Sequence, residues 1–563
     1  IAIEQFAHAT ASVATAAAAL TNSAVASLTI AANAFASATS AAFATAIVGT
    51  AIEQSAAASG VTLANADVSL VNNGTINIVA NATAIATGIL APASGTTFVL
   101  GVATANAVVG AGISQNAFAS AFTTASVGTI TAGSGAIVFL YGGDANASAT
   151  LTNTGTLNIA ANALASAAFA SASAVVGTGI SQSATAQGGS DADASVTLTN
   201  SVTGVINIGA VATALGTIAA TAFASVGTGI TQNADAEVES GLASASAALN
   251  NDGLITIGAS AFASANGFIP TGTAVNGFAS ASAVVGTGIF QSASASGFGT
   301  GTLVHLPGST TVAFFIGNAE ANVSLTNSGT IGILANAGAT GSVALAFASV
   351  GAGIVQSATA FAASSANANV SLTNTADATI AVLADAVAVG TFVASATASI
   401  GTGISQFASA SGTVANAGVS LINGGSIVVD ADATATATTF AFAGAFIGQG
   451  IDQSAFATGS AGTASAILAN SGLIAIAADA TATGLFASAV AVVGTGIQQS
   501  AFGLDAGLAS LTNSGTIAIV AEADACNIGT STFAGAFAFI GAGISQSATA
   551  FLTGGVATAT LVN

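Results

Sequence analysis

The residues best suited to chemistry in this chain are acidic side chains two positions apart. Three pairs are present: Asp191 with Asp193, Asp430 with Asp432, and Glu522 with Asp524. In an extended strand, residues i and i+2 point to the same face, so each pair would place hard oxygen ligands side by side, as Ca²⁺ prefers. The chain has neither an EF-hand loop nor a calcium-binding nonapeptide repeat. We interpret the pairs as solvated surface, with weak Ca²⁺ binding as the alternative, and expect no other cofactor.

Other candidates for catalysis are isolated. His8 and His305 are remote in sequence and have no Cys or His partner for a metal or a catalytic triad, and the single Cys526 cannot form an internal disulfide. The recurring Gly-x-Gly lacks the rest of a dinucleotide-binding motif and predicts corners between strands. Paired carboxylates can hydrolyse glycosides, but a site for an acidic polysaccharide would also need Arg or Lys. We predict that the protein is not an enzyme.

Composition excludes several partners. The 563 residues include no Lys or Arg and 20 Asp or Glu, for a net charge of −20. Nucleic acids and anionic membrane surfaces both require basic side chains. No run of residues is long and apolar enough for a transmembrane helix, so we expect no membrane insertion. The lack of trypsin sites, Met and Trp favours a secreted or cell-surface location. The chain starts without Met and ends within a repeat, so we expect a processed or truncated piece.

Two short motifs alternate along the whole chain. Both occur eleven times and usually recur after about 47–50 residues, which predicts one continuous repeat array over residues 1–563. The Ile-x-Gln motif contributes Gln5, Gln54, Gln115, Gln182, Gln232, Gln291, Gln356, Gln406, Gln453, Gln499 and Gln546. The Leu-x-Asn motif contributes Asn22, Asn72, Asn153, Asn200, Asn251, Asn327, Asn374, Asn423, Asn470, Asn513 and Asn563.

The residues between these motifs alternate with period two, which predicts β-strands. Repeats of strands and Gly corners predict an all-β fold, a β-solenoid of about eleven stacked parallel repeats of about 48 residues each. Stacking places each Gln above the next and each Asn above the next. Their amides carry both donors and an acceptor, so each column can form a hydrogen-bonded ladder that fixes the register. The sequence leaves open whether a repeat makes one coil or two.

A third polar column follows the anchor Leu by eleven residues in the best-aligned repeats. It begins with amides and becomes acidic toward the C-terminus, and slightly longer repeats place Asn33 and Asp385 similarly. Its members are Asn81, Asn162, Ser260, Asn336, Asp432, Asp479 and Glu522. We predict a polar ladder here as well.

Four insertions interrupt the pattern, at about 87–104, 117–145, 264–277 and 294–318. All three prolines lie within them, and proline cannot donate to a strand ladder. We predict loops or side hairpins that project from the stack and provide lateral contacts.

The "LTNSGTIGI" of residues 325–333 and the "LTNSGTIAI" of residues 511–519 resemble the repeated Asn-x-Gly-x-Ile of autotransporter passengers and large repeat adhesins of Gram-negative bacteria. This resemblance implies a secreted β-solenoid, often adhesive, in which Asn327 and Asn513 are structural. The chain is also similar, more weakly, to bacterial functional amyloids such as the curli subunit, whose repeats are about half as long.

These observations predict an extracellular structural protein. Stacking of solenoid subunits head to tail would form a fibre, a biofilm matrix or a surface sheath, with the open strand edges as templates for a cross-β filament. One alternative is an adhesin that binds a host or surface ligand through its insertions. A second is an ice-binding solenoid, which would require a flat array of threonines.

Overall fold

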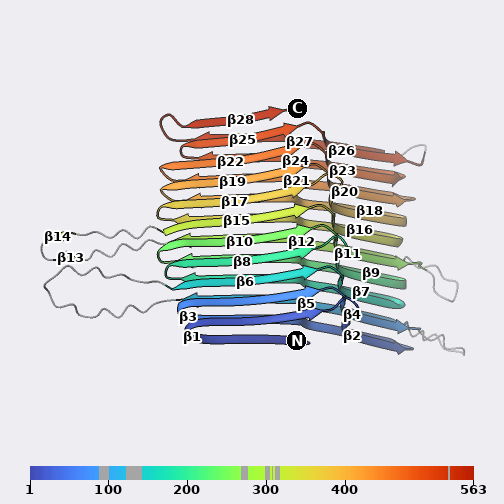
Figure 1. The fold of residues 1–563 in the computed structure, drawn as a ribbon. Helices are drawn as coiled ribbons and strands as arrows, with labels where there is room; N and C mark the ends of the chain where they lie inside the picture. The colour runs from blue at the N-terminus through green and yellow to red at the C-terminus, as the bar shows by residue number, and fades with distance from the viewer. Residues whose placement is uncertain are drawn as a thin grey trace, which may run out of the picture.

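In a computed structural model, residues 1–87, 100–121, 143–267, 277–297, 305–306, 309–310, 317–529 and 533–563 are described. Apart from one short hairpin, β13 (His305–Leu306) with β14 (Ser309–Thr310), their strands form a single parallel sheet of 26 strands wound into a stack of coils (Figure 1). Ile3 pairs with Ile52 and Leu20 with Leu70, so each repeat makes one coil. The predicted β-solenoid is confirmed. No described helix could cross a membrane.

Each complete coil has three segments: a long bent segment, a second segment and a third segment. The bent segment stands alone in β5 (Val102–Ala121), β12 (Phe278–Gly297), β21 (Phe440–Thr458), β24 (Phe486–Gly503) and β27 (Phe533–Ala550). It continues into the second segment in β1 (Ile3–Asn22) and β3 (Ala41–Asn72). It follows the third segment without a break in β7 (Thr156–Gly188), β9 (Val205–Val238), β16 (Thr330–Ala362) and β18 (Thr379–Ser411).

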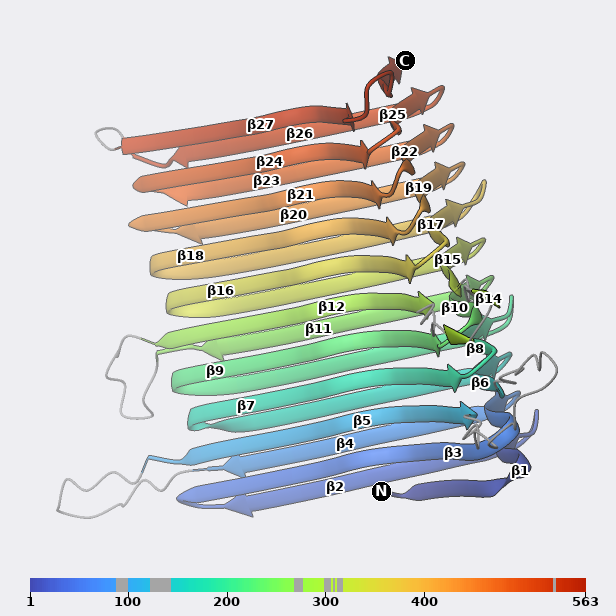
Figure 2. The same ribbon diagram turned by 90° about the vertical axis from the view of Figure 1, so that its left-hand side faces the viewer.

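The remaining strands contain one segment each. The second segment forms β6 (Asp144–Asn153), β8 (Asp191–Asn200), β10 (Gly241–Asn251), β15 (Gly317–Asn327), β17 (Ser365–Asn374), β19 (Val414–Asn423), β22 (Ala461–Asn470), β25 (Ala506–Asn513) and β28 (Val556–Val562). The third segment forms β2 (Ser27–Ala38), β4 (Thr75–Ala86), β11 (Leu254–Ala265), β20 (Ser426–Ala437), β23 (Leu473–Gly484) and β26 (Thr516–Asn527). Figure 2 shows the bent and third segments as two neighbouring layers of long strands.

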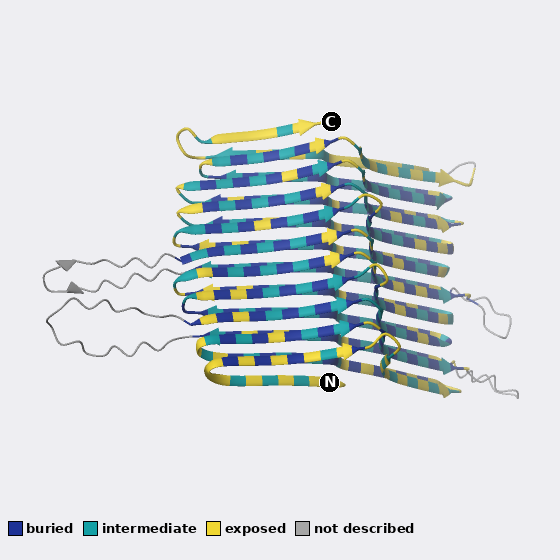
Figure 3. Cartoon of the chain, in the orientation of Figure 1, coloured by how far each residue is buried: buried dark blue, intermediate teal, exposed yellow. Residues whose placement is uncertain are grey.

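The alternation in the sequence becomes an alternation of burial along each strand, visible as coloured bands in Figure 3. In β4, Ile76, Ile78 and Ala80 are buried, while Thr75 and Asn77, which alternate with them, point outward. The third segment packs on the first half of the bent segment, and the second segment packs on its other half, which gives two apolar cores. Alanine dominates both cores, because its small side chain lets two sheet layers approach closely.

The predicted Gly-x-Gly corners mark the bend of the long segment. At the second glycine, an isoleucine or valine of the third segment fills the space that a side chain would need. A Cβ on Gly179 would lie only 2.5 Å from Cδ1 of Ile208. Glycine at this position lets the two layers approach closely at the corner, and in β3 the equivalent place is held by a slightly larger residue, Ala51.

Phenylalanine is excluded from the core. No described Phe is buried, and the buried apolar side chains are Ala, Val, Leu and Ile. In the described part of the chain, the largest apolar side chains consequently lie on the outer faces, where they gain little from folding the single chain.

The four predicted insertions fall in the connections between one segment of the coil and the next. The core strands extend into the ends of these ranges, since β5 ends at Ala121 and β12 at Gly297. Most of each insertion, including Pro92, Pro270, Pro307 and Tyr141, lies outside the described residues. Their role in lateral contacts or ligand binding stays a prediction.

Candidate functional surfaces

The glutamines of the Ile-x-Gln motif form one ladder through all eleven coils. Gln232 donates from Nε2 to Oε1 of Gln182 at 3.0 Å and to the backbone carbonyl of Ala248 at 2.9 Å. Gln182 and Gln232 have no exposed surface. The second bond joins the bent segment to the second segment across the core. Equivalent amide–amide bonds of 2.7–3.0 Å link every neighbouring pair from Gln5 to Gln546.

The asparagines of the Leu-x-Asn motif form a second continuous ladder, where the second segment turns into the third. Asn200 donates from Nδ2 to Oδ1 of Asn251 at 2.8 Å and to the carbonyl of Leu254 at 3.2 Å. The chain of bonds runs from Asn22 to Asn563. Each Asn donates to the following coil, whereas each Gln donates to the preceding coil. The two ladders therefore have opposite directions.

These ladders hold the register of the stack. A slip of one residue would leave every buried amide in a ladder without its partner, at about 1–3 kcal/mol for each. The structure thus places all the predicted Gln and Asn residues in structural positions, with their polar groups directed at one another.

The third column lies on the outer side of the third segment, where the backbone register aligns it through ten coils. Its N-terminal end is an amide ladder: Asn81 donates to Asn33 at 2.8 Å and Asn162 donates to Asn81 at 2.9 Å. Val211 then interrupts it. We call Asn33, Asn81 and Asn162 the amide part of this column.

The C-terminal end of the column is acidic. Asp385, Asp432, Asp479 and Glu522 lie in register on β18, β20, β23 and β26, and we call these four residues the acidic part. Asp430 lies beside them on β20. The Oδ1 atoms of Asp430 and Asp479 are buried and have no hydrogen-bond partner. Carboxylates in this arrangement repel one another, and the chain has no basic side chain to compensate.

Burial raises the pKa values of four aspartates in and beside this column, and mutual repulsion adds to the effect in three of them. Burial, followed by the charges of Asp479, Asp432 and Asp385, raises the pKa of Asp430 to about 6. Burial also raises the pKa of Asp385. In Asp432 and Asp479 burial is again the main cause of a raised pKa, and the neighbouring carboxylates add to it. Both causes disfavour the charged form, so these carboxyl groups bind protons at a higher pH than exposed carboxyl groups do.

The acidic pairs proposed from sequence are divided between two surfaces. Asp430, Asp432 and Glu522 lie together in or beside the acidic part, with Asp524 next to it. Asp191 and Asp193 lie apart on β8, where Oδ1 of Asp191 accepts a hydrogen bond from the backbone nitrogen of Leu242 at 3.1 Å. Within the described residues, no three or more His, Cys, Asp or Glu side chains are grouped so that they could hold a metal ion. Ca²⁺ binding stays a prediction without a preformed site.

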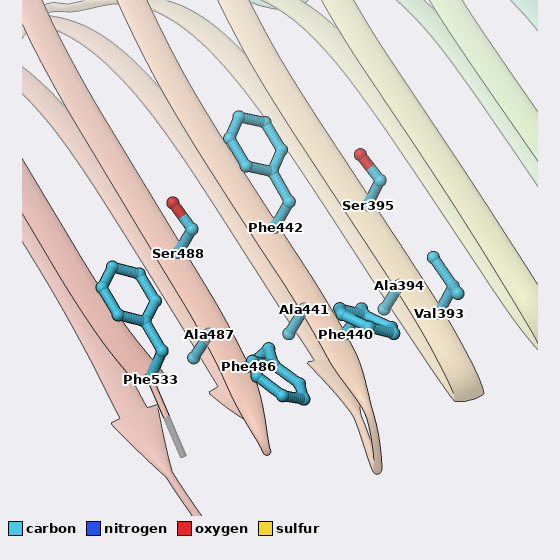
Figure 4. Close-up of a pocket in the computed structure, with 10 residues that line it drawn as sticks. All are labelled: Val393, Ala394, Ser395, Phe440, Ala441, Phe442, Phe486, Ala487, Ser488 and Phe533. Atoms are coloured by element: carbon cyan, nitrogen blue, oxygen red, sulfur yellow. The ribbon is translucent and has the colours of Figure 1, made fainter.

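A shallow apolar groove lies on the outer side of the bent segments near the C-terminal end (Figure 4). Phe440 and Phe486 stack with ring centres 5.0 Å apart along one edge. Phe442 and Phe533 bound the hollow, and the hydroxyl of Ser488 is one of its few polar groups. This surface suits apolar side chains better than a charged or strongly polar ligand.

Threonines form only short columns on the described surfaces. On the second segment, Thr152 pairs with Thr199, but Asn250 follows in the next coil. Thr326 and Thr373 continue the same column, and Ile422 then interrupts it. A column broken this often does not favour an ice-binding surface.

Comparisons with models of protein families, with curated proteins and with solved structures gave no significant match. The resemblance to autotransporter passengers and adhesins therefore has support only at the level of the β-solenoid fold. Any function must be argued from the residues of this chain.

Proposed function

We propose that the protein is an extracellular structural protein whose solenoids assemble into a fibre, matrix or sheath. The observation that supports this most is the pair of uninterrupted amide ladders, which join all eleven coils. The chain uses its buried polar side chains to fasten coils together. A long stack with fixed register is suited to bearing load and to resisting proteases, because local opening must break several aligned bonds at once.

Head-to-tail stacking is the mode of assembly that the ladders favour. In the Gln ladder the donors face the N-terminal end of the stack, and in the Asn ladder they face the C-terminal end. A second stack with the same direction offers a donor for every acceptor in both ladders. A stack with the opposite direction would oppose donors to donors in one ladder and acceptors to acceptors in the other, so the ladders select one polarity of assembly.

Sedimentation and negative-stain microscopy over a range of protein concentrations test the proposal. We expect particles whose length increases with concentration in steps of about 53 Å, the height of eleven coils at about 4.8 Å each. Protein that stays monomeric at all concentrations and at both acidic and neutral pH would contradict it.

A further inference from the structure

One outer surface of the solenoid carries no charge. It consists of the outward residues of the bent segment before the Gly-x-Gly bend. In β5 these are Val102, Thr104, Asn106 and Val108, and their register partners occupy the ten coils from β3 to β27. We call these forty positions the uncharged face. All twenty acidic residues of the chain lie elsewhere, past the bend, on the other two segments or in turns.

The uncharged face is also rich in phenylalanine. Twelve of its forty residues are Phe, and ten more are Val, Ile or Leu. The polar residues among them are Ser, Thr and Asn only. Phe440 and Phe486 are 52% and 43% exposed, although a buried Phe would stabilise the fold far more. Such a surface gains free energy when a second apolar surface covers it.

The size of the face fits a stable protein–protein interface. Ten strands about 4.8 Å apart and seven residues of about 3.3 Å each give about 48 by about 23 Å, or about 1,100 Å². A standard interface buries about 800 Å² on each partner. Figure 2 shows the long strands that carry this face lying side by side along the stack.

The distribution of charge on the chain indicates which partner would bind the uncharged face. With a net charge of −20 and no basic residue, two copies repel each other wherever their carboxylates meet. Contact through the uncharged faces keeps every carboxylate outside the interface. The same face on both partners gives an isologous contact, and the groove of Figure 4 offers a hollow for a phenylalanine of the opposing copy.

We propose that the uncharged face binds the uncharged face of a second copy of this chain and pairs two solenoids side by side. This lateral contact rests on the proposed structural function and names the surface that joins neighbouring stacks. It is distinct from the head-to-tail contact, which uses the coil edges. It also differs from contacts through the insertions, because all of its residues belong to the regular coils.

Two double variants of β7 test the pairing with matched charge. Ser171→Glu with Ser173→Glu places two carboxylates on the uncharged face. Ser181→Glu with Ser183→Glu places two carboxylates on the outer side of the same strand past the bend, again beside uncharged neighbours. We expect the first variant to weaken lateral dimerisation in sedimentation equilibrium by about tenfold or more, because unpaired charges would be buried. The second variant should dimerise like the wild type.

A neutral variant guards against effects on folding. Phe278→Ser with Phe347→Ser removes two exposed rings of the uncharged face and touches no core position, so it should fold normally by circular dichroism and still dimerise less. Wild-type protein that forms no side-by-side pairs, or a control variant that loses pairing as much as the first, would overturn the proposal. Microscopy separates the two contacts. Single-width fibres would refute pairing alone, and dimers without fibres would refute head-to-tail assembly alone.

Discussion

The amide part and the acidic part of the surface column occupy the same place in the coil but differ in what holds their members. In the amide part, Asn81 and Asn162 each donate a hydrogen bond to the coil below. In the acidic part the backbone register is equally regular, yet an oxygen atom of Asp479, and one of Asp430 beside this part, have no hydrogen-bond partner. The comparison shows that backbone pairing and the buried ladders set the register. The surface column changes only how stable the coils around it are.

Replacing an amide of the buried Gln ladder by an acid should have the largest effect on stability. Gln232→Glu would place a carboxylate where the side chain has no exposed surface and would remove the donor to Gln182. We expect a loss of about 3–5 kcal/mol at neutral pH, because the buried charge would have no counter-charge and would face the acceptor oxygens of Gln182 and Ala248. Chemical denaturation measures it. A loss below about 1 kcal/mol would show that the ladder does not hold the coils. Gln232→Leu separates the effect of the charge from that of the missing bond.

Replacing the acidic part by amides should remove the difference between the two parts. The variant with Asp385→Asn, Asp432→Asn, Asp479→Asn and Glu522→Gln can form three new bonds between coils, each worth about 1 kcal/mol. We expect local stability to rise by about 2–3 kcal/mol in β20 and β23, measured by hydrogen exchange. Exchange in β4 serves as the internal control and should not change. Faster exchange in β20 would contradict the idea that repulsion loosens this region.

The reverse exchange, of amides for acids in the amide part, should make the coils around that part less stable. Asn81→Asp with Asn162→Asp breaks two amide bonds and places carboxylates on neighbouring coils. We expect β4 and the start of β7 to lose about 1–2 kcal/mol at neutral pH, again by hydrogen exchange. The loss should shrink at acidic pH as the carboxyl groups gain protons. An effect that does not depend on pH would indicate lost packing in place of charge.

The smallest effect should come from pH on the wild-type chain. The carboxyl groups of Asp385, Asp430, Asp432 and Asp479 have raised pKa values in the folded state. Their protonation therefore favours folding. For Asp430 this contribution is complete below about pH 4 and is lost as the pH rises through its folded-state pKa of about 6. Partial exposure screens these charges, so we expect a modest increase in protection of β20 and β23 on acidification. The amide part should show no such change after correction for intrinsic exchange rates.

Sequence reasoning predicted the ladders because Gln and Asn recur as single types at fixed distances from an apolar anchor. It located the surface column by counting from the same anchor, and it omitted Val211 because a longer turn after Asn200 shifts that count. It could not decide between one coil and two in each repeat, since spacing along the chain does not reveal where the chain closes on itself.

The uncharged face was not recognised from sequence. Its signal is present as the absence of acidic residues before each Gly-x-Gly, but it becomes a surface only when ten coils are aligned. Insertions of unequal length hide that alignment in the linear sequence. The exposure of phenylalanine was equally hidden, because large apolar residues in alternating strands are expected to point inward. Here the inward positions hold alanine, and the narrow space between the layers leaves no room for a ring.

The opposite directions of the two ladders have an electrostatic consequence. Each side-chain amide is a small dipole, and a column of aligned amides adds its dipoles as a helix adds those of its peptide groups. In the Gln column the dipoles point one way along the stack, and in the Asn column they point the other way. The two sums largely cancel, so extra coils would lengthen such a structure without building up a field along its axis.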